Sequence, residues 1–399
     1  MNAHSLLRKS VGAKFSKIAG FLAVTGVGLG TMVILITMAI VQGYQQEVPK
    51  LLETFSGEAQ ILPARIGQST ESGSMVLPNE QRKALQANEN IQSYYPFALK
   101  AGITQTETEF EGIVLQGVGE GFPAEKLKNV LLKGRTPSFR KESKECAIPE
   151  PLAKKLGLKI GATLPVIFVQ QPPRTRAFTV VGIFKNPMEH ETGRPVVLVP
   201  LHHVQAVNGW DSSTVGGYQI HFQQGTNIQK EVDEIHNSLP MTLEAFSLGE
   251  LFPQLFQWLA LFDTNQSIIL VIMLAVAGLN MMSALVLLVL EKKKEVGLMR
   301  ALGLPAAAVS RLFRWWSLRL VGRGLLFGNL LAGSILLSQH YFHWLSLDEK
   351  LYYLSYAPVA LDGLSWAITN LGIALFCWLS MMVPSRVVAK LDIIESLKN

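Results

Sequence analysis

The chain has 399 residues, of which 49% are hydrophobic and 17% charged, so it carries fewer charges than the roughly 25% of a soluble globular protein. The net charge of +6 is unevenly spread: residues 44–266 hold 20 Lys+Arg and 23 Asp+Glu, whereas the remainder holds 16 and 7. Because this basic excess flanks uncharged segments, it is typical of membrane topology, and nucleic-acid binding is excluded as the function.

Residues 1–17 are predicted to form a cytoplasmic amphipathic helix. Apolar side chains from Leu6 to Phe15 recur at helical spacing among basic residues, a pattern suited to lying on an anionic inner leaflet. The alternative is a disordered basic tail that only fixes topology. Residues 18–43 are predicted to be the first transmembrane helix, retained as an anchor, because the uncharged run is longer than a signal sequence core and is followed by no Ala-x-Ala cleavage site.

Residues 44–266 are predicted to form a mixed α+β domain inserted between the first two transmembrane helices. Runs of β-branched residues bounded by Gly and Pro predict strands at 57–64, 109–118, 163–169, 177–184 and 194–200. Segments that begin with Pro predict helices at 78–86, 123–132 and 149–157. Between two of the strands, "QQPPRTR" (170–176) is predicted to be an ordinary turn or a projecting hairpin tip.

Three further transmembrane helices are predicted at 267–290, 316–339 and 363–383. Basic residues cluster before the first span, in the loop 291–315 and in the tail 384–399, whereas the short loop 340–362 holds only Lys350. The positive-inside rule therefore predicts that both termini are cytoplasmic and that 44–266 faces outward.

Polar and small residues within the predicted spans indicate contacts between helices. Asn280 and Asn329 each lie near the middle of a span, where an amide usually faces another helix. "GVGLG" (26–30) places three glycines in the first span, and small residues permit close approach of helices. We expect all of them to contribute to helix packing rather than to substrate binding.

The segment 291–313, "EKKKEVGLMRALGLPAAAVSRLF", is predicted to contact a soluble partner. Good helix formers continue up to Gly303, and Pro305 suits the first turn of a new helix. "AAAVSRLF" (306–313) is expected to be a short helix lying across the membrane plane before the aromatic pair at 315–316. A short helix between two transmembrane helices would pass motion between the partner and the spans.

The sequence offers no catalytic constellation. "MEHETG" (188–193) and the histidines at 202–203 do not bring three or four metal ligands together, so solvated turn residues are the favoured interpretation. A Gly-x4-Gly-Lys-[Ser/Thr] phosphate loop is missing from the whole sequence. We therefore expect a chain that is not an enzyme, binds no cofactor or metal directly, and relies on another chain for any ATP hydrolysis.

Segment 291–313 resembles the signature that precedes the ATPase-docking helix in FtsX/MacB-type (type VII) permeases of ABC transporters. The closing "MVPSRVVAKLDIIESLKN" is similar to the end of that family, with Ile393 in place of the usual proline. Within the family, "AVTGVGLGTMVILITMAIVQGYQQEV", "IPEPLAKKLGLKIGATLPVIF" and "FTVVGIF" look like segments of the lipoprotein-releasing permeases LolC and LolE.

This resemblance implies four transmembrane helices and a periplasmic α+β domain with MacB-like porter and sabre subdomains. It implies a bacterial inner-membrane complex of two permease subunits, of the same chain or a paralogue, with a dimeric LolD-like ATPase that binds ATP and Mg. The transporter would extract lipoproteins from the outer leaflet by mechanotransmission and pass them to a LolA-like periplasmic carrier. The alternatives are an FtsX-like transducer that regulates a cell-wall hydrolase and a MacB-like efflux permease.

The resemblance also implies roles for individual residues. The ATPase-coupling residues would be Glu295, Gly297, Arg300, Gly303, Ala307, Val309 and Phe313, and the lipid and substrate cavity would be lined by Met38, Val41, Ile268 and Ile272. The hairpin that binds the carrier in LolC-like proteins is longer than "QQPPRTR". Either this hairpin recruits no carrier or the carrier has a different surface; Arg174 and Arg176 are the candidate contacts.

Overall fold

The computed structural model describes residues 17–64, 71–105, 109–185, 193–291, 297–298 and 301–380. The chain forms two compact units: residues 1–46 with 258–399 make the first, and Glu47–Gln257 make the second. The amphipathic helix predicted for 1–17 lies, apart from its last residue, outside the described residues.

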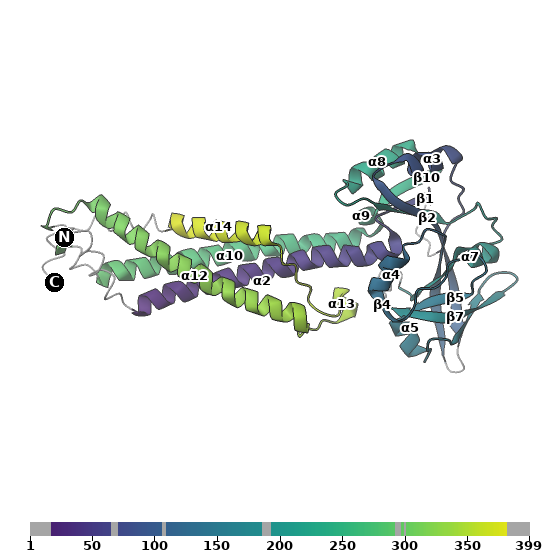
Figure 1. The fold of residues 1–399 in the computed structure, drawn as a ribbon, viewed down its shortest axis with the longest axis horizontal. Helices are drawn as coiled ribbons and strands as arrows, with labels where there is room; N and C mark the ends of the chain where they lie inside the picture. Colours follow the sequence, from purple (N-terminus) through teal and green to yellow (C-terminus); the bar gives the residue numbers. More distant parts are fainter. Residues whose placement is uncertain are drawn as a thin grey trace. The chain divides into compact units, whose positions relative to one another are not determined.

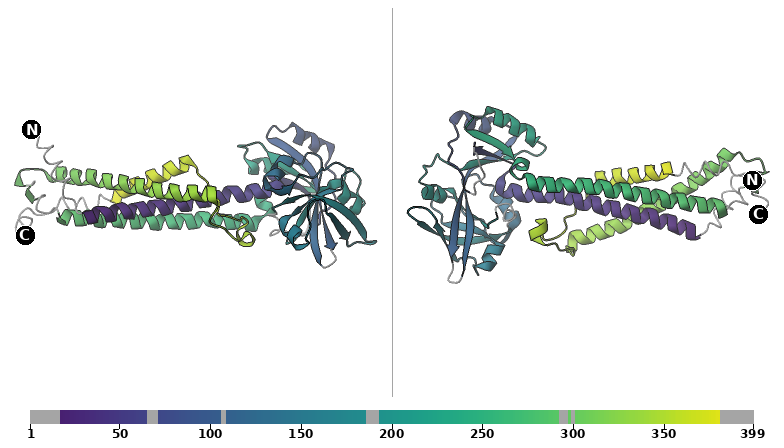
Figure 2. Two further views of the ribbon diagram at one scale, coloured as in Figure 1. Left: turned by 60° about the horizontal axis from the view of Figure 1, so that its bottom comes forward. Right: turned by 180° about the vertical axis from the view of Figure 1, so that it is seen from behind.

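The first unit is helical. Its long helices are α2 (Lys17–Ser56), α10 (Pro253–Glu291), α12 (Ala306–Phe342) and α14 (Gly363–Ser380), and α13 (Glu349–Tyr352) is a single turn between the last two. The four long helices run alongside one another (Figures 1 and 2). All four are long and apolar enough to cross a membrane, which confirms the four predicted spans.

Two of these helices extend beyond the predicted spans. The sequence predicts the first span at 18–43 and the second at 267–290, whereas α2 continues to Ser56 and α10 already begins at Pro253. The physical reason is that hydropathy marks only the part of a helix that meets lipid. A helix continues wherever its residues are helix formers, as in "LLETFS" at the end of α2.

The region before the third span also differs from the expectation. The sequence predicts a short helix at 306–313 separated from a span at 316–339, but the structure has one continuous helix, α12. Its first 16 residues contain neither Gly nor Pro, so the backbone meets no signal to end the helix. Pro305 precedes the helix as its N-cap residue, close to the predicted place.

The second unit is built on one sheet. Its ten strands within the described residues are β1 (Ala59–Pro63), β2 (Ile91–Gln105), β3 (Phe110–Val118), β4 (Leu131–Gly134), β5 (Glu145–Pro149), β6 (Thr163–Phe168), β7 (Arg174–Phe184), β8 (Val196–Pro200), β9 (Gly217–Phe222) and β10 (Leu243–Ser247). The strands β2, β3, β8, β5, β7 and β6 pair in that order, and β6 pairs with β2 to close a ring.

The long strand β2 connects the ring to the rest of the sheet. Its first half, up to Phe97, pairs with β9, and its second half pairs with β3. From β9 the sheet continues through β1 to β10. The domain therefore has two parts, a closed ring and an open extension, which share β2. This mixed architecture between the first and second long helices is the predicted fold.

Short helices flank the sheet. They are α3 (Asn79–Ala87), α4 (Ala124–Val130), α5 (Glu150–Lys155), α7 (Leu201–Asn208), α8 (Ile228–Ser238) and α9 (Leu248–Leu251). Figure 1 shows α3 and α8 beside β10 and β1, and α7 beside the ring. Buried side chains from both parts of the sheet belong to one hydrophobic cluster, so the domain has a single core.

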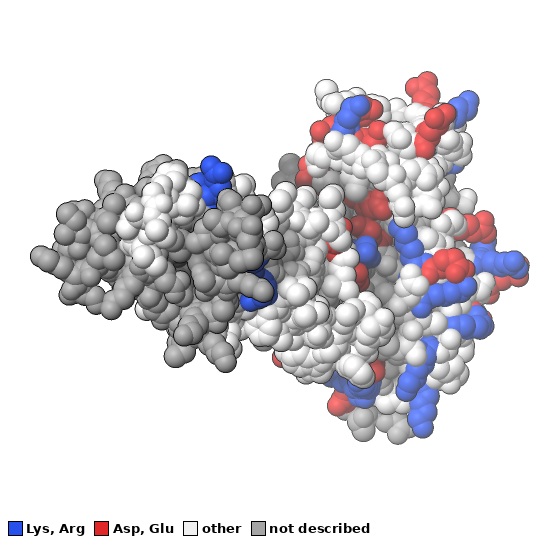
Figure 3. Space-filling model, turned by 60° about the vertical axis from the view of Figure 1, so that its left-hand side comes forward, with Lys and Arg blue, Asp and Glu red and all other residues white. Residues whose placement is uncertain are grey.

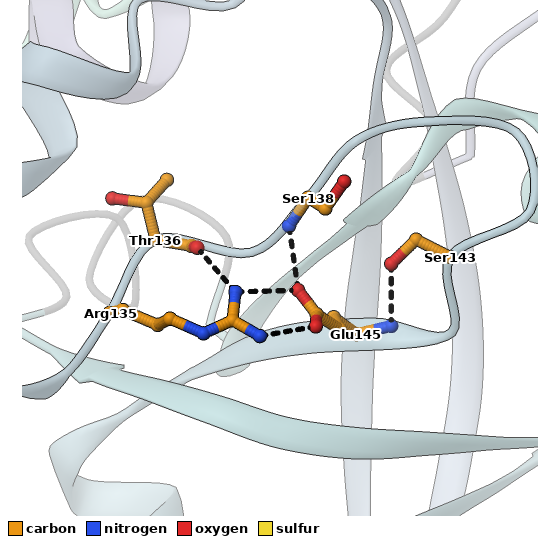
Figure 4. Close-up of polar contacts among 5 residues, drawn as sticks. All are labelled: Arg135, Thr136, Ser138, Ser143 and Glu145. Atoms are coloured by element: carbon orange, nitrogen blue, oxygen red, sulfur yellow. Dashed lines mark hydrogen bonds and ion pairs between the residues drawn. The ribbon is translucent and has the colours of Figure 1, made fainter.

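An ion pair holds the loop between β4 and β5. The Arg135 guanidinium donates through both terminal nitrogens to the Glu145 carboxylate, and the backbone N–H of Ser138 donates to the same carboxylate at 2.8 Å (Figure 4). The hydrogen bonds from Arg135 hold the pKa of Glu145 below its usual value. The loop is thereby closed at its base by a two-point contact.

Charge is distributed as expected for the two units. In Figure 3 the domain carries many Lys, Arg, Asp and Glu side chains. Within the domain, residues 126–185 hold 13 Lys+Arg and 3 Asp+Glu, a net of +10, although 44–266 as a whole has a net charge of −3.

Candidate functional site

In the first unit, α2 crosses α12 at a contact made by glycines. A Cβ atom added to Gly328 would lie 2.5 Å from the backbone oxygen of Gly28, and one added to Gly324 would lie 2.8 Å from Cβ of Val27. The backbones therefore approach too closely for any larger residue. The prediction that "GVGLG" permits close helix approach is confirmed.

The same segment of α2 also contacts α10. A Cβ atom at Gly26 would lie 2.6 Å from the side-chain nitrogen of Asn280, and one at Gly30 would lie 3.7 Å from Cβ of Ala277. Glycines at positions 26 and 30 thus meet α10, while Gly28 meets α12. Because α2 contacts both helices, half of its most apolar segment is buried.

Asparagine side chains connect α12 and α14. Asn329 donates to the side-chain oxygen of Asn370 at 2.6 Å and accepts from the indole nitrogen of Trp366. Asn370 also donates to Asn329 at 3.1 Å. This confirms the packing role predicted for Asn329. Asn280 lies against Gly26, although the residue is exposed.

The predicted coupling residues are only partly within the described chain. Glu295 and Arg300 lie outside the described residues, and so do the side chains of Ala307 and Phe313. Gly297 is buried. Gly303 has a φ of +89°, the left-handed conformation that commonly follows a helix, and the N–H of Leu302 donates to the Leu298 oxygen one turn earlier. The break at Gly303 is therefore confirmed.

Val309 is not on a free surface. Its side chain is 1% exposed and belongs to the buried cluster that contains Ala23 and Val27 of α2. Any influence of Val309 on a partner would act through helix packing. The exposed apolar side chains near Gly303 are instead Leu298 at 57% and Leu302 at 80%. Sequence reasoning missed them, although two apolar residues next to a predicted helix end were a usable signal.

The structure places the four predicted cavity residues in two different environments. Met38 and Val41 are buried between helices, and Met38 accepts a hydrogen bond from Thr369. Ile268 and Ile272 are about half exposed on α10. Met38 lines a cavity of about 10 Å³, which is too small for an acyl chain. An all-round apolar helix such as α2 gives no sequence periodicity that marks its exposed face.

The predicted hairpin is present in the second unit. Strands β6 and β7 pair from Thr163 with Thr179 to Phe168 with Arg174, so residues 169–173 form the tip. Arg174 donates to the backbone oxygens of Ala206 and Val207, at 2.6 and 3.1 Å, at the C-terminal end of α7. Its guanidinium is therefore engaged within the domain, although Arg174 and Arg176 are both exposed.

Comparison with known families decides the identity of the chain. A model described as "MacB-like periplasmic core domain" matches residues 21–237, more than half of the chain, and one described as "FtsX-like permease C-terminal" matches 267–393. The chain belongs to the FtsX/MacB-type family of ABC transporter permeases. The resemblance seen in the sequence is thus confirmed.

Curated relatives of this permease span almost its whole length. It is 22% identical over 397 residues to the "Lipoprotein-releasing system transmembrane protein LolE" of Haemophilus influenzae, covering 95% of this chain and 92% of LolE. It is 21% identical over 419 residues to LolC of Neisseria meningitidis serogroup B, covering 96% and 95%. A solved structure of the periplasmic region of MacB from Actinobacillus actinomycetemcomitans aligns at 14% identity over 53% of this chain and 98% of that chain, with a TM-score of 0.37.

The permease is accordingly an inner-membrane protein with a periplasmic core domain between its first two long helices. Within the described residues no three His, Cys, Asp or Glu side chains are grouped so as to hold a metal ion. The rings of His202 and His203 lie 3.8 Å apart, and His203 contacts the Ser143 backbone oxygen at 2.8 Å. Of "MEHETG", only Gly193 lies within the described residues.

Proposed function

We propose that this permease extracts lipoproteins from the outer leaflet of the inner membrane and passes them to a periplasmic carrier. A separate ATPase of the LolD type would bind ATP and Mg and supply the energy, while this chain converts it into movement of its helices. A second permease subunit, identical or paralogous, would complete the complex. Both termini would be cytoplasmic.

The observation that carries this proposal is the alignment with LolE and LolC, two proteins of lipoprotein-releasing systems, over more than nine-tenths of this chain. The two family models follow each other along the chain, the periplasmic core domain first and the permease C-terminal region second. The exposed face of α10 agrees with a helix that meets lipid or cargo, because Ile268 and Ile272 are about half exposed there.

The main experiment is depletion of the chain followed by membrane fractionation. We expect outer-membrane lipoproteins to accumulate in the inner membrane. If they leave the inner membrane normally, lipoprotein release is not the function. Filamentous cells with normal lipoprotein sorting would support the FtsX-like alternative, and drug sensitivity with normal sorting would support the efflux alternative.

We further propose that the ATPase docks on the segment around Gly303, with the predicted coupling residues and the exposed Leu298 and Leu302 forming or supporting the contact. Leu302 is apolar and 80% exposed, so its side chain is available to a partner next to the turn at Gly303. Leu302→Asp is expected to reduce stimulation of the ATPase at least tenfold without preventing membrane insertion.

Met241→Asp is a matched control, because Met241 is 99% exposed in the periplasmic domain. Like Leu302→Asp, this variant introduces one negative charge at an exposed apolar position. We expect wild-type ATPase stimulation. Equal stimulation in the Leu302→Asp and Met241→Asp variants would refute the docking assignment.

The carrier contact is proposed at Arg176 rather than Arg174, because the Arg174 guanidinium already caps α7. Arg176→Glu is expected to weaken carrier binding. Arg174→Glu would weaken carrier binding only indirectly, through loss of the hydrogen bonds from Arg174 to the end of α7. The lipid-facing role is proposed for Ile268 and Ile272, since Met38 and Val41 are buried within their own bundle.

A further inference from the structure

The C-terminal end of α2 is held inside the periplasmic domain by buried glutamines. The last carbonyl groups of a helix have no partner within the helix and usually bind water or a local cap. Here Gln116 and Gln219 both donate to the Phe55 backbone oxygen, at 2.6 and 2.8 Å, and Gln60 donates to the Ser56 oxygen at 2.8 Å. We call these three residues the capping glutamines.

The capping glutamines come from three different strands. Gln60 on β1 lies directly opposite Gln219 on β9, and Gln116 lies on β3, so the end of one helix is bonded to three strands of the sheet. Gln116 and Gln219 are 1% exposed and Gln60 is 8% exposed. The Phe55 side chain is fully buried, and its ring lies 5.1 Å from that of Phe184 on β7. The end of α2 is therefore fixed by both polar and apolar contacts.

The start of α9 is bonded at the same place. After Gly57, which has a φ of +71°, the N–H of Glu58 donates to the Ile220 oxygen of β9 at 2.9 Å. The Glu58 oxygen accepts from the N–H of Leu248, the first residue of α9, at 3.0 Å. Strand β1, which follows α2, also pairs with β10, which leads into α9 and α10. The connections of both long helices to the domain thus share one set of hydrogen bonds.

Burying two amide side chains costs folding free energy, so their presence here calls for a reason. Within the described residues, the side-chain oxygens of Gln116 and Gln219 have no hydrogen-bond partner. The contribution of each side chain is therefore the hydrogen bond that its nitrogen donates to the Phe55 oxygen. An unpaired buried acceptor destabilises a fold. A cap that keeps water away from the helix end prevents the fraying that a solvated end undergoes.

We propose that Gln116 and Gln219 are positioning residues of the transport cycle, which pass a displacement of α2 directly to the sheet of the periplasmic domain. The inference rests on the proposed function only in requiring that a partner ATPase drives movement of α2. A frayed helix end would absorb a small displacement, whereas an end bonded to β3 and β9 moves the strands with it.

The test uses the full-length permease purified with its ATPase partner, and its variant is Gln116→Met with Gln219→Met. Methionine keeps the length and volume of the side chain but donates no hydrogen bond. Hydrogen exchange at the amides of Gly57 and Glu58 is expected to become about tenfold faster. ATP with vanadate is expected to change exchange in β1 and β9 of the wild type but not of the variant, at an unchanged basal ATPase rate.

Gln205→Met is the matched control. Gln205 is also a buried glutamine that donates to a backbone oxygen, that of Thr214 at 2.9 Å, but it lies on α7. This variant is expected to retain the nucleotide-dependent change in β1 and β9. If the double variant does not insert, the single Gln219→Met variant is used, with an intermediate effect expected.

Three results would overturn the inference: unchanged exchange at Gly57 and Glu58 in the double variant, a full nucleotide-dependent change despite faster exchange, or no such change in the wild type. None of these readouts uses lipoprotein cargo. A wild type that responds to nucleotide but releases no lipoprotein would therefore refute the proposed cargo and leave this inference standing.

Discussion

Replacing Gly328 with alanine is expected to destabilise the packing of α12 against α2. The added Cβ would lie 2.5 Å from the Gly28 backbone oxygen and 2.7 Å from Cβ of Thr31. Ordinary contacts begin near 3.4 Å, so the helices must separate by about 0.9 Å. A backbone atom cannot rotate away as the end of a flexible side chain can.

The magnitude follows from two opposing effects. Overpacking of this kind costs about 1–3 kcal/mol. Exchanging glycine for alanine within a helix, by itself, stabilises by about 0.5–1 kcal/mol. Gly333 lies on the same helix, and among the described residues beyond its own stretch of helix no atom lies within 4 Å of an added Cβ, so Gly333→Ala shows the second effect alone. Both variants share the glycine-to-alanine gain, so their unfolding free energies should differ by the overpacking cost alone, about 1–3 kcal/mol.

The assay is reversible unfolding of the full-length protein in mixed micelles, followed by tryptophan fluorescence. Gly328→Ala should unfold at a lower denaturant fraction than the wild type, and Gly333→Ala at an equal or higher one. If Gly328→Ala is as stable as Gly333→Ala, the close approach of α12 to α2 is not present in the protein.

Three further predictions concern polar groups. Asn370→Leu removes a partner of Asn329 and should lower the unfolding free energy of the helices by about 1 kcal/mol, measured in the same micelle titration; an unchanged midpoint would contradict the interhelical bond. Burial lowers the pKa of His221 to about 3, so its imidazole is neutral in the fold and binds a proton more readily when unfolded. Between pH 6.5 and 3 the domain should therefore lose stability as the pH falls, by at most about 1.4 kcal/mol per unit from this group, and hydrogen exchange in β9 should show a weaker pH dependence in His221→Asn. Glu145→Gln should speed tryptic cleavage after Arg140, because the ion pair with Arg135 closes that loop; equal cleavage rates would mean that the pair does not hold the loop.

Much of the fold could be predicted because its signals are local. The four spans follow from long uncharged runs, and the five predicted strands correspond to β1, β3, β6, β7 and β8. The hairpin at 169–173 and the break at Gly303 follow from turn chemistry. Each of these features depends on residues that are close together in the sequence.

Features that depend on distant residues were missed. The long strand β2 contains Pro96 and Gly102, which argue against a strand, but pairing with β9 on one half and β3 on the other overrides that preference. Likewise, the segment 306–313 contains small residues that fit either a separate helix or the start of a longer one. In the structure Val309 is buried, in the same hydrophobic cluster as Ala23 and Val27 of α2.

The candidate site was the least predictable part. Hydropathy identifies α2 and α10 as membrane helices but does not say which side chains face outward, because both are apolar on every side. Burial separates the inward-facing Met38 and Val41 from the exposed Ile268 and Ile272. Arg174 appeared free in the sequence because its partners, the carbonyl groups of Ala206 and Val207, lie 32 and 33 residues away.

The ring of six strands has a consequence for protein engineering and for sequence variation. Six residue pairs join β6 and β7 below the tip, and the strands on either side of them complete the ring. Extra residues inserted between Val169 and Pro173 would extend away from a base that is already closed. This hairpin is therefore a position where length can change without altering the registers that close the ring, and where an affinity tag or a foreign binding loop can be inserted while the rest of the domain keeps its fold.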